Sequence, residues 1–166
     1  QEEIEKSFLK NTKSKKSDFH GAGREDIDAR NLAWRPFVIE IVKPLKRKID
    51  LKKILKEVNK SKKVKVRKLK FSNKDFVRKL KAMKIDKTYS AEVEFENKVD
   101  KKKLKLVKNL EKEKIKQQTP TRVMHRRADK IRIRNVKKIS YKILGEKKVR
   151  FVIRGESGLY IKELIN

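Results

Sequence analysis

Apolar and polar residues alternate along several stretches of this chain, and this two-residue period constrains the fold most. The clearest stretch, Thr88 to Glu96, places Tyr89, Ala91, Val93 and Phe95 on one face of a strand. Other sets read as further strands: Ile131, Ile133 and Val136, then Ile139, Tyr141 and Ile143, then Val149, Phe151 and Ile153. A mixed, largely antiparallel sheet is expected.

Helical patterns surround these strands. Three helices are expected after capping residues: from Asp50 to about Asn59, from Ser72 or Asn73 to Met83, and from Asp100 to about Glu111. Residues 1–16 read as a short helix or a frayed lead-in. Two more strands are expected at Pro36–Pro44 and Lys63–Phe71, an irregular segment at 116–121, and a basic hairpin or loop at 122–134. The prediction is an α+β fold whose sheet is flanked by helices.

The chain carries a large excess of positive charge. Its 51 Lys and Arg residues against 22 Asp and Glu residues give a net charge of +29. Such a charge opposes compaction and favours a polyanionic partner, of which nucleic acid is the leading candidate. No apolar run approaches the roughly 20 residues of a membrane-spanning helix. The absence of Cys excludes thiolate catalysis and cysteine-based zinc sites, and a cytoplasmic protein is expected.

One segment departs from this lysine-rich composition. His20–Arg30 reads His-Gly-Ala-Gly-Arg-Glu-Asp-Ile-Asp-Ala-Arg. Gly21 and Gly23 can adopt positive φ angles, so the chain can turn tightly there and hold acids beside Arg24 and Arg30. This composition is typical of a catalytic loop.

The central acid of this loop is Asp26, and Glu25 and Asp28 are its rivals. An acidic surface loop paired with its own arginines is the simpler interpretation. A carboxylate in a basic groove, however, repels the phosphates that the groove must bind. Its presence therefore indicates chemistry at the base or the sugar of a nucleic acid.

Two other residues have more than one interpretation. Tyr89 begins the buried face of its strand and can be a core aromatic with its hydroxyl at the rim. Lys162 lies in an apolar segment, where its ammonium either reaches water along its aliphatic stem or pairs with a buried acid.

These pieces together resemble a known family. Gly23-Arg-Glu-Asp26, Tyr89 within Lys-Thr-Tyr-Ser-Ala, and Leu159-Tyr-Ile-Lys162 follow the order and approximate spacing of three active-site motifs of pseudouridine synthases. The His20–Arg30 loop, Arg35-Pro-Phe, Gln118-Thr-Pro-Thr-Arg-Val and His125-Arg-Arg-Ala-Asp resemble the archaeal and eukaryotic tRNA synthase that modifies uridines 54 and 55. The resemblance covers about Phe19 to Leu164.

The resemblance implies isomerisation of uridine to pseudouridine in the TΨC arm of tRNA, with no cofactor. It implies that Asp26 is the essential aspartate, either as a nucleophile or as the base that removes the ribose C2′ proton. It further implies that Tyr89 stacks on the flipped base and that Lys162 pairs with the aspartate and keeps it ionised.

The basic residues near the loop and in the later hairpin are expected to contact RNA. They are Arg24, Arg30, Arg122, His125, Arg126, Arg127, Lys130, Arg132 and Arg134. A non-catalytic basic RNA-binding protein, such as a ribosomal or RNP component, is the alternative function. The two histidines lie far apart in the sequence and make no case for a metal site.

The expected domain organisation is a lead-in or linker at residues 1–17 and a pseudouridine synthase catalytic domain at 18–166. Full-length members of the family carry an amino-terminal RNA-binding module with a cysteine-based zinc site, and their catalytic domain continues past the Leu-Tyr-Ile-Lys motif. The chain is therefore expected to be a fragment, or one half of a split protein whose other parts a separate chain supplies.

Overall fold

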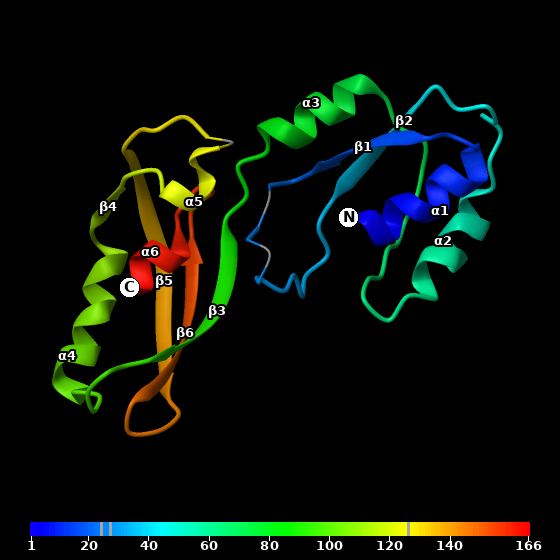
Figure 1. Ribbon diagram of the computed structural model, residues 1–166. Helices are drawn as coiled ribbons and strands as arrows, with labels where there is room; N and C mark the ends of the chain where they lie inside the picture. The colour runs from blue at the N-terminus through cyan, green and yellow to red at the C-terminus, as the bar shows by residue number, and fades with distance from the viewer. Residues whose placement is uncertain (24, 27, 126) are drawn as a thin grey trace. The chain divides into compact units, whose positions relative to one another are not determined.

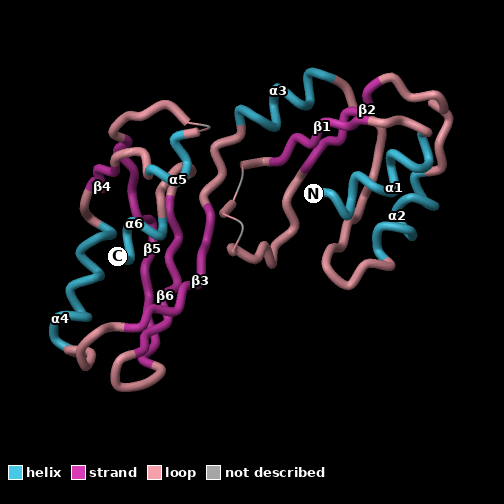
Figure 2. Tube along the Cα trace, in the orientation of Figure 1, coloured by secondary structure: helices cyan, strands magenta, loops and turns pink. Residues whose placement is uncertain are grey.

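The chain folds into two compact units, each with its own sheet (Figures 1 and 2). The computed structural model describes residues 1–23, 25–26, 28–125 and 127–166. Unit 1 comprises Gln1–Met83 and unit 2 comprises Lys84–Asn166. All strand pairs found in the described residues are antiparallel, which confirms the expected α+β class.

Unit 1 combines a two-stranded sheet with three helices. Its elements are α1 (Glu2–Thr12), β1 (Lys16–Gly21), β2 (Phe37–Val42), α2 (Leu51–Asn59) and α3 (Lys74–Ala82). Asp50 accepts hydrogen bonds from the backbone N–H groups of Lys52 and Lys53, and Asn73 accepts one from Phe76. Both predicted helices therefore begin at side-chain caps, as expected.

The core of unit 1 lies between α1, α2 and the sheet. Ile4 and Phe8 of α1 are buried together with Ile54 and Val58 of α2, and Val66 closes the cluster. Residues 1–16 thus contain a helix, which confirms the first of the two alternatives for this segment. The predicted boundary between residues 17 and 18 stays a prediction.

The predicted strand at Lys63–Phe71 is wrong. Among the described residues this segment pairs with no strand, although Val66 is buried as the alternation requires. The Asn59 side chain replaces a partner strand: its Oδ1 accepts from Val66 N at 2.7 Å, and its Nδ2 donates to Val66 O at 2.9 Å. Lys68 then takes a left-handed conformation with φ 55°, which a regular strand does not contain.

Unit 2 contains a four-stranded sheet in the order β3-β6-β5-β4 (Figure 1). Its elements are β3 (Lys87–Glu94), α4 (Lys101–Lys105), the 3-10 helix η1 (Leu106–Glu111), β4 (Lys114–Gln117), α5 (Thr121–Met124), β5 (Arg132–Ile143), β6 (Lys148–Gly155) and α6 (Ile161–Ile165). Asp100 caps α4 as predicted. The predicted helix to Glu111 continues only as η1, and the segment at 116–121 is irregular only between β4 and α5.

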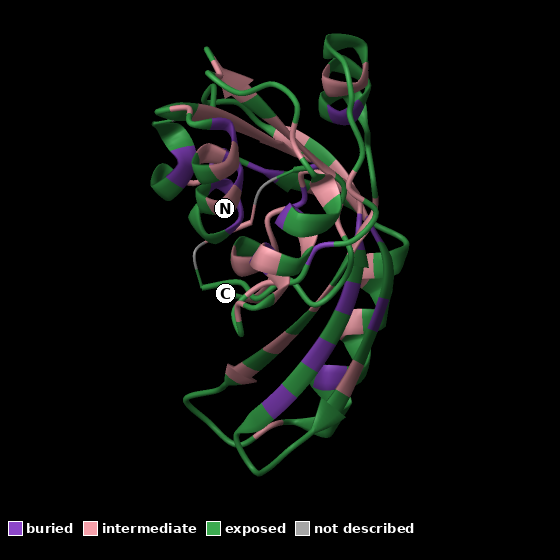
Figure 3. Cartoon of the chain, turned by 90° about the vertical axis from the view of Figure 1, so that its right-hand side faces the viewer, coloured by how far each residue is buried: buried purple, intermediate pink, exposed green. Residues whose placement is uncertain are grey.

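One face of this sheet forms the core of unit 2. Val149, Phe151 and Ile153 alternate inward along β6, and the alternation of buried and exposed residues along the strands is visible in Figure 3. Leu104 of α4 and Leu159, ahead of α6, complete the buried cluster. The alternating patterns of β3 and β6 are thus confirmed, except that Phe95 follows the end of β3 and is exposed.

The two strands predicted between residues 131 and 143 are a single strand, β5. The pairing with β6 shifts register between Val136 and Lys138, so one extra residue is accommodated there. This bulge lets Val136 and Ile139 both face the core although their spacing is odd. Ile131 and Ile133, which precede this bulge, are exposed.

In the part of the chain that the structure describes, no helix combines the length and apolar character needed to cross a membrane.

Candidate functional site

The segment that carries Asp26 connects β1 to β2. Gly21 pairs with Phe37 at the end of the two-stranded ladder, and Ala22 N donates to Pro36 O at 3.1 Å, which closes the base of the loop. Gly23 has φ 83°, so its glycine is required, as predicted. Gly21 does not need positive φ, contrary to expectation, because it still belongs to β1.

The three acids of this loop have different surroundings. Glu25 forms an ion pair with Arg35 at 2.6 Å, and both side chains are largely buried, with 16% and 24% exposed. Asp26 is half-buried, and its backbone carbonyl accepts from Ala29 N at 3.0 Å, which forms a turn. Asp28 is exposed. Glu25 therefore has a structural partner across the loop, and Asp26 is the more protected of the two remaining acids.

Arg24 and Arg30 were expected beside these acids. Arg24 lies outside the described residues, and Arg30 is exposed. The arginine that pairs with Glu25 is Arg35, on the far side of the loop. RNA contacts by Arg24 and Arg30 stay predictions.

Tyr89 and Lys162 both belong to unit 2. Tyr89 is half-buried on β3, where it pairs with Ile153 of β6, and Lys162 is half-buried in α6. Asp26 belongs to unit 1. The catalytic roles of the three residues, and their meeting in one site, stay predictions.

The turn before Lys162 is held by hydrogen bonds from the sheet. Gln117 of β4 binds Tyr160 twice, because its Oε1 accepts from Tyr160 N at 2.9 Å and its Nε2 donates to Tyr160 O at 2.8 Å. A Cβ on Gly155 would lie 2.4 Å from Leu159 Cδ2, so Leu159 packs directly over the glycine. These contacts fix the backbone from which Lys162 projects.

A second set of contacts holds the same turn from β5. Glu156 accepts from both Asn135 N and Asn135 Nδ2 at 3.0 Å, and it pairs with Lys137 Nζ at 3.0 Å. The Asn135 side chain, then Lys137 and the Asn135 backbone, lower the pKa of Glu156 from 4.5 to about 2. Arg134 Nε donates to Ser157 O at 2.9 Å. The turn is therefore preorganised when Glu156 is ionised.

The lowered pKa predicts that Glu156 stabilises unit 2 only above acidic pH. Its contribution should be full above about 4.5, the pKa expected when unfolded, and should disappear as the pH falls towards about 2. The stability difference between the wild type and Glu156→Gln, measured by urea unfolding, should therefore shrink between pH 5 and pH 2.5. Glu113→Gln, which removes an exposed charge, is the control. A pH-independent difference for Glu156→Gln would contradict the assignment.

The loop between β4 and β5 is organised around one buried hydroxyl. Thr119 is only 1% exposed. Its Oγ1 lies within hydrogen-bond distance of Ala128 O at 2.9 Å and of Lys130 N at 3.2 Å, and it also accepts from Arg132 Nη1. Gln118 Nε2 donates to Asp129 Oδ1 in the same loop. The polar segment at 116–121 thus closes the predicted basic loop.

Replacing Thr119 by Val should loosen this loop. Valine has nearly the same shape but no oxygen, so Lys130 N and Arg132 Nη1 lose their shared acceptor. The expected loss is about 1–3 kcal/mol in the free energy of unfolding, measured with urea, and faster hydrogen exchange at the Lys130 amide. Thr119→Ser keeps the oxygen and should retain the protected amide. An unchanged exchange rate in Thr119→Val would refute this role.

The other residues predicted to bind RNA take two kinds of position. His125, Arg127 and Lys130 are exposed, whereas Arg126 lies outside the described residues. Arg132 and Arg134 are half-buried and donate to backbone carbonyls of the loop and the turn. Their described contacts are those of positioning residues, and RNA contacts by all of these residues stay predictions.

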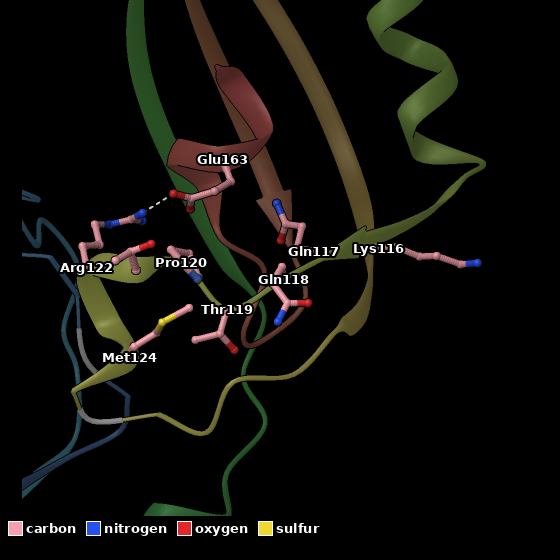
Figure 4. Close-up of a pocket in the computed structure, with 9 residues that line it drawn as sticks. Lys116, Gln117, Gln118, Thr119, Pro120, Arg122, Met124 and Glu163 are labelled. Carbon is pink, nitrogen blue, oxygen red and sulfur yellow. Dashed lines mark hydrogen bonds and ion pairs between the residues drawn. The ribbon is translucent and has the colours of Figure 1, made fainter.

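A pocket of about 630 Å³ lies between this loop and α6 (Figure 4). Arg122 of α5 forms an ion pair with Glu163 of α6 across it, and Figure 4 shows the two side chains pointing towards each other. Further lining residues are Lys116, Gln117, Gln118, Thr119, Pro120, Thr121 and Met124. The pair joins the basic loop to the helix that carries Lys162.

Sequence reasoning missed three positioning residues: Gln117, Thr119 and Glu163. The partner of Gln117 is 43 residues away in the chain, those of Thr119 are 9, 11 and 13 residues away, and that of Glu163 is 41 residues away. One signal was available for Gln117 and Thr119: the polar run Gln-Gln-Thr-Pro-Thr lies at the end of a strand, where it can hold the following loop.

The sequence of the chain was compared with models of known protein families. The chain matches the family model described as Pus10, C-terminal, over residues 1–166. The chain belongs to this family, and the resemblance to tRNA pseudouridine synthases is confirmed.

Individual relatives support the same placement. The chain is 48% identical to the tRNA pseudouridine synthase Pus10 of Methanocaldococcus jannaschii over 169 residues, which cover 100% of this chain and 37% of the relative. It is 46% identical to that of Methanothrix thermoacetophila, covering 89% and 33%, and 44% identical to that of Methanosphaera stadtmanae, covering 98% and 41%. The chain thus spans less than half the length of these relatives.

Proposed function

We propose that this chain is the catalytic part of a tRNA pseudouridine synthase that isomerises uridine 54, uridine 55 or both. The observation that carries the proposal is the family match over all 166 residues, joined by relatives named as tRNA pseudouridine synthases. The net charge of +29 fits a polyanionic substrate.

The reaction is an isomerisation, so the atoms balance without a co-reactant. The bond between N1 of uracil and C1′ of ribose breaks, the base turns, and C5 bonds to C1′. The proton that C5 loses is matched by the one that N1 gains. The chain needs only to extrude the uridine, hold the freed base and move protons.

The proposal assigns a role to each catalytic residue. Asp26 acts as the nucleophile or as the base at C2′, Tyr89 stacks on the flipped uracil, and Lys162 provides the positive charge that keeps the carboxylate ionised. The structure supports these assignments within each unit. Asp26 is half-buried in a closed loop, and Lys162 follows a turn held by β4 and β5.

The test is conversion of uridine in a tRNA transcript incubated with the protein, detected by mass-tagging of pseudouridine. Transcripts with cytidine in place of uridine 54 or of uridine 55 assign the position. Pseudouridine at either site supports the proposal. Tight tRNA binding with no conversion in any transcript would instead favour the non-catalytic RNA-binding alternative, which the charge alone fits equally well.

A further inference from the structure

Trp34 is the only tryptophan of the chain, and 53% of it is exposed. Large aromatic side chains are usually well buried in a protein of this kind. The indole ring nevertheless has a contact, because the Arg67 guanidinium carbon lies 4.3 Å from the ring centroid. A cation over an exposed indole presents a planar, polarisable surface to solvent.

Arg67 belongs to a strongly basic surface segment. Residues 60–70 contain no acid and the following seven cations: Lys60, Lys62, Lys63, Lys65, Arg67, Lys68 and Lys70. All seven are exposed, whereas Val64, Val66 and Leu69 pack towards the core of unit 1. The alternation in this segment therefore separates two sides: the apolar side chains anchor the segment to unit 1, and the cations face solvent.

Trp34 is also linked to the loop acid. The Glu25–Arg35 ion pair, at 2.6 Å, joins the two sides of the loop between β1 and β2. Asp26 and Trp34 are the chain neighbours of these two residues. Trp34 therefore lies on the same loop as the proposed catalytic carboxylate. Arg67 contacts it from the basic segment 60–70.

We propose that Trp34 and Arg67 form a stacking platform for an unpaired nucleotide of the RNA substrate, and that the basic segment 60–70 contacts the adjoining phosphates. The proposal rests on the proposed function for the identity of the RNA. Aromatic rings and guanidinium planes accept any base by stacking, and a stripe of cations follows a phosphate backbone. A protein partner with acidic side chains would use the charges but would gain little from the planar pair.

The platform can be tested through its own fluorescence, because Trp34 is the only tryptophan. Single-stranded oligouridylate should quench this fluorescence saturably, and a duplex of equal length should quench it much less. Trp34→Ala should weaken single-strand binding about tenfold without changing its salt dependence. Trp34→Phe should restore most of the affinity. Lys62→Ala, the matched control in the basic segment, should lower the salt slope by about one and leave the quenching in place.

Several results would overturn the platform. These are fluorescence that oligouridylate leaves unchanged, equal quenching by the duplex or by a polyglutamate peptide, and unchanged affinity in a folded Trp34→Ala protein. The wild-type titration needs no variant, so it remains decisive if a variant fails to fold. Quenching in a protein that makes no pseudouridine would support the platform and refute only the proposed function. An active enzyme without quenching would do the reverse.

Discussion

Asp26→Asn should abolish pseudouridine formation, lowering the rate by about a thousandfold or more, while tRNA affinity stays within a few fold. Asparagine has nearly the same size as aspartate, so the loop between β1 and β2 should keep its closing bonds. It can neither attack carbon nor remove the C2′ proton. Removal of a negative charge does not weaken attraction to phosphates. Single-turnover conversion of tRNA at saturating enzyme separates the chemical step from binding.

The two rival acids provide matched controls in the same loop. Asp28→Asn should retain activity because Asp28 is exposed. Glu25→Gln should act through structure, since it breaks the ion pair with Arg35, and should therefore lower thermal stability as well as activity. An active Asp26→Asn protein together with an inactive Asp28→Asn protein would move the catalytic role to Asp28.

Local features of the fold could be predicted from the sequence. The caps at Asp50, Asn73 and Asp100 bind N–H groups two or three residues ahead, so the information lies within one turn. The alternation of β3 and β6 likewise follows from a period that any sheet with one buried face imposes.

The failures share one cause: a partner that the local pattern does not reveal. Val66 alternates as a strand residue would, yet its backbone is bonded by the Asn59 side chain. Val136 and Ile139 have a spacing that breaks a strand pattern, yet the pairing with β6 absorbs the extra residue in a bulge. Alternation predicts which side chains are buried, but not which backbone groups pair.

The candidate site divides in the same way. The motif residues Asp26, Tyr89 and Lys162 could be named from the sequence, because each lies in a short run of consecutive residues that resembles a family motif. The residues that hold the Lys162 motif in place could not, because the partners of Gln117 and Glu163 lie more than 40 residues away in the sequence. Loop closure by Glu25 and Arg35 was also missed, since the sequence pattern favoured the nearer arginines.

Ile153→Ala should destabilise unit 2 by about 2–5 kcal/mol. Ile153 of β6 is fully buried and is paired with Tyr89 of β3 on one side and with Ile139 of β5 on the other. Truncation removes three carbon atoms from the centre of the core, and paired strands on both sides restrict its collapse. The measurement is the free energy of unfolding in urea, followed by a probe within unit 2.

The neighbouring residue supplies the control, because Val152 is on the same strand but faces the other way and is 40% exposed. Val152→Ala should cost well under half as much as Ile153→Ala, although both remove methyl groups from one strand. Equal losses would mean that strand propensity, rather than burial, sets the stability of β6. A larger loss of unfolding free energy in Ile153→Ala would show that core packing holds the strand that pairs with Tyr89. Ile153→Ala should then also lower activity, because Tyr89, the predicted stacking residue, is less firmly held.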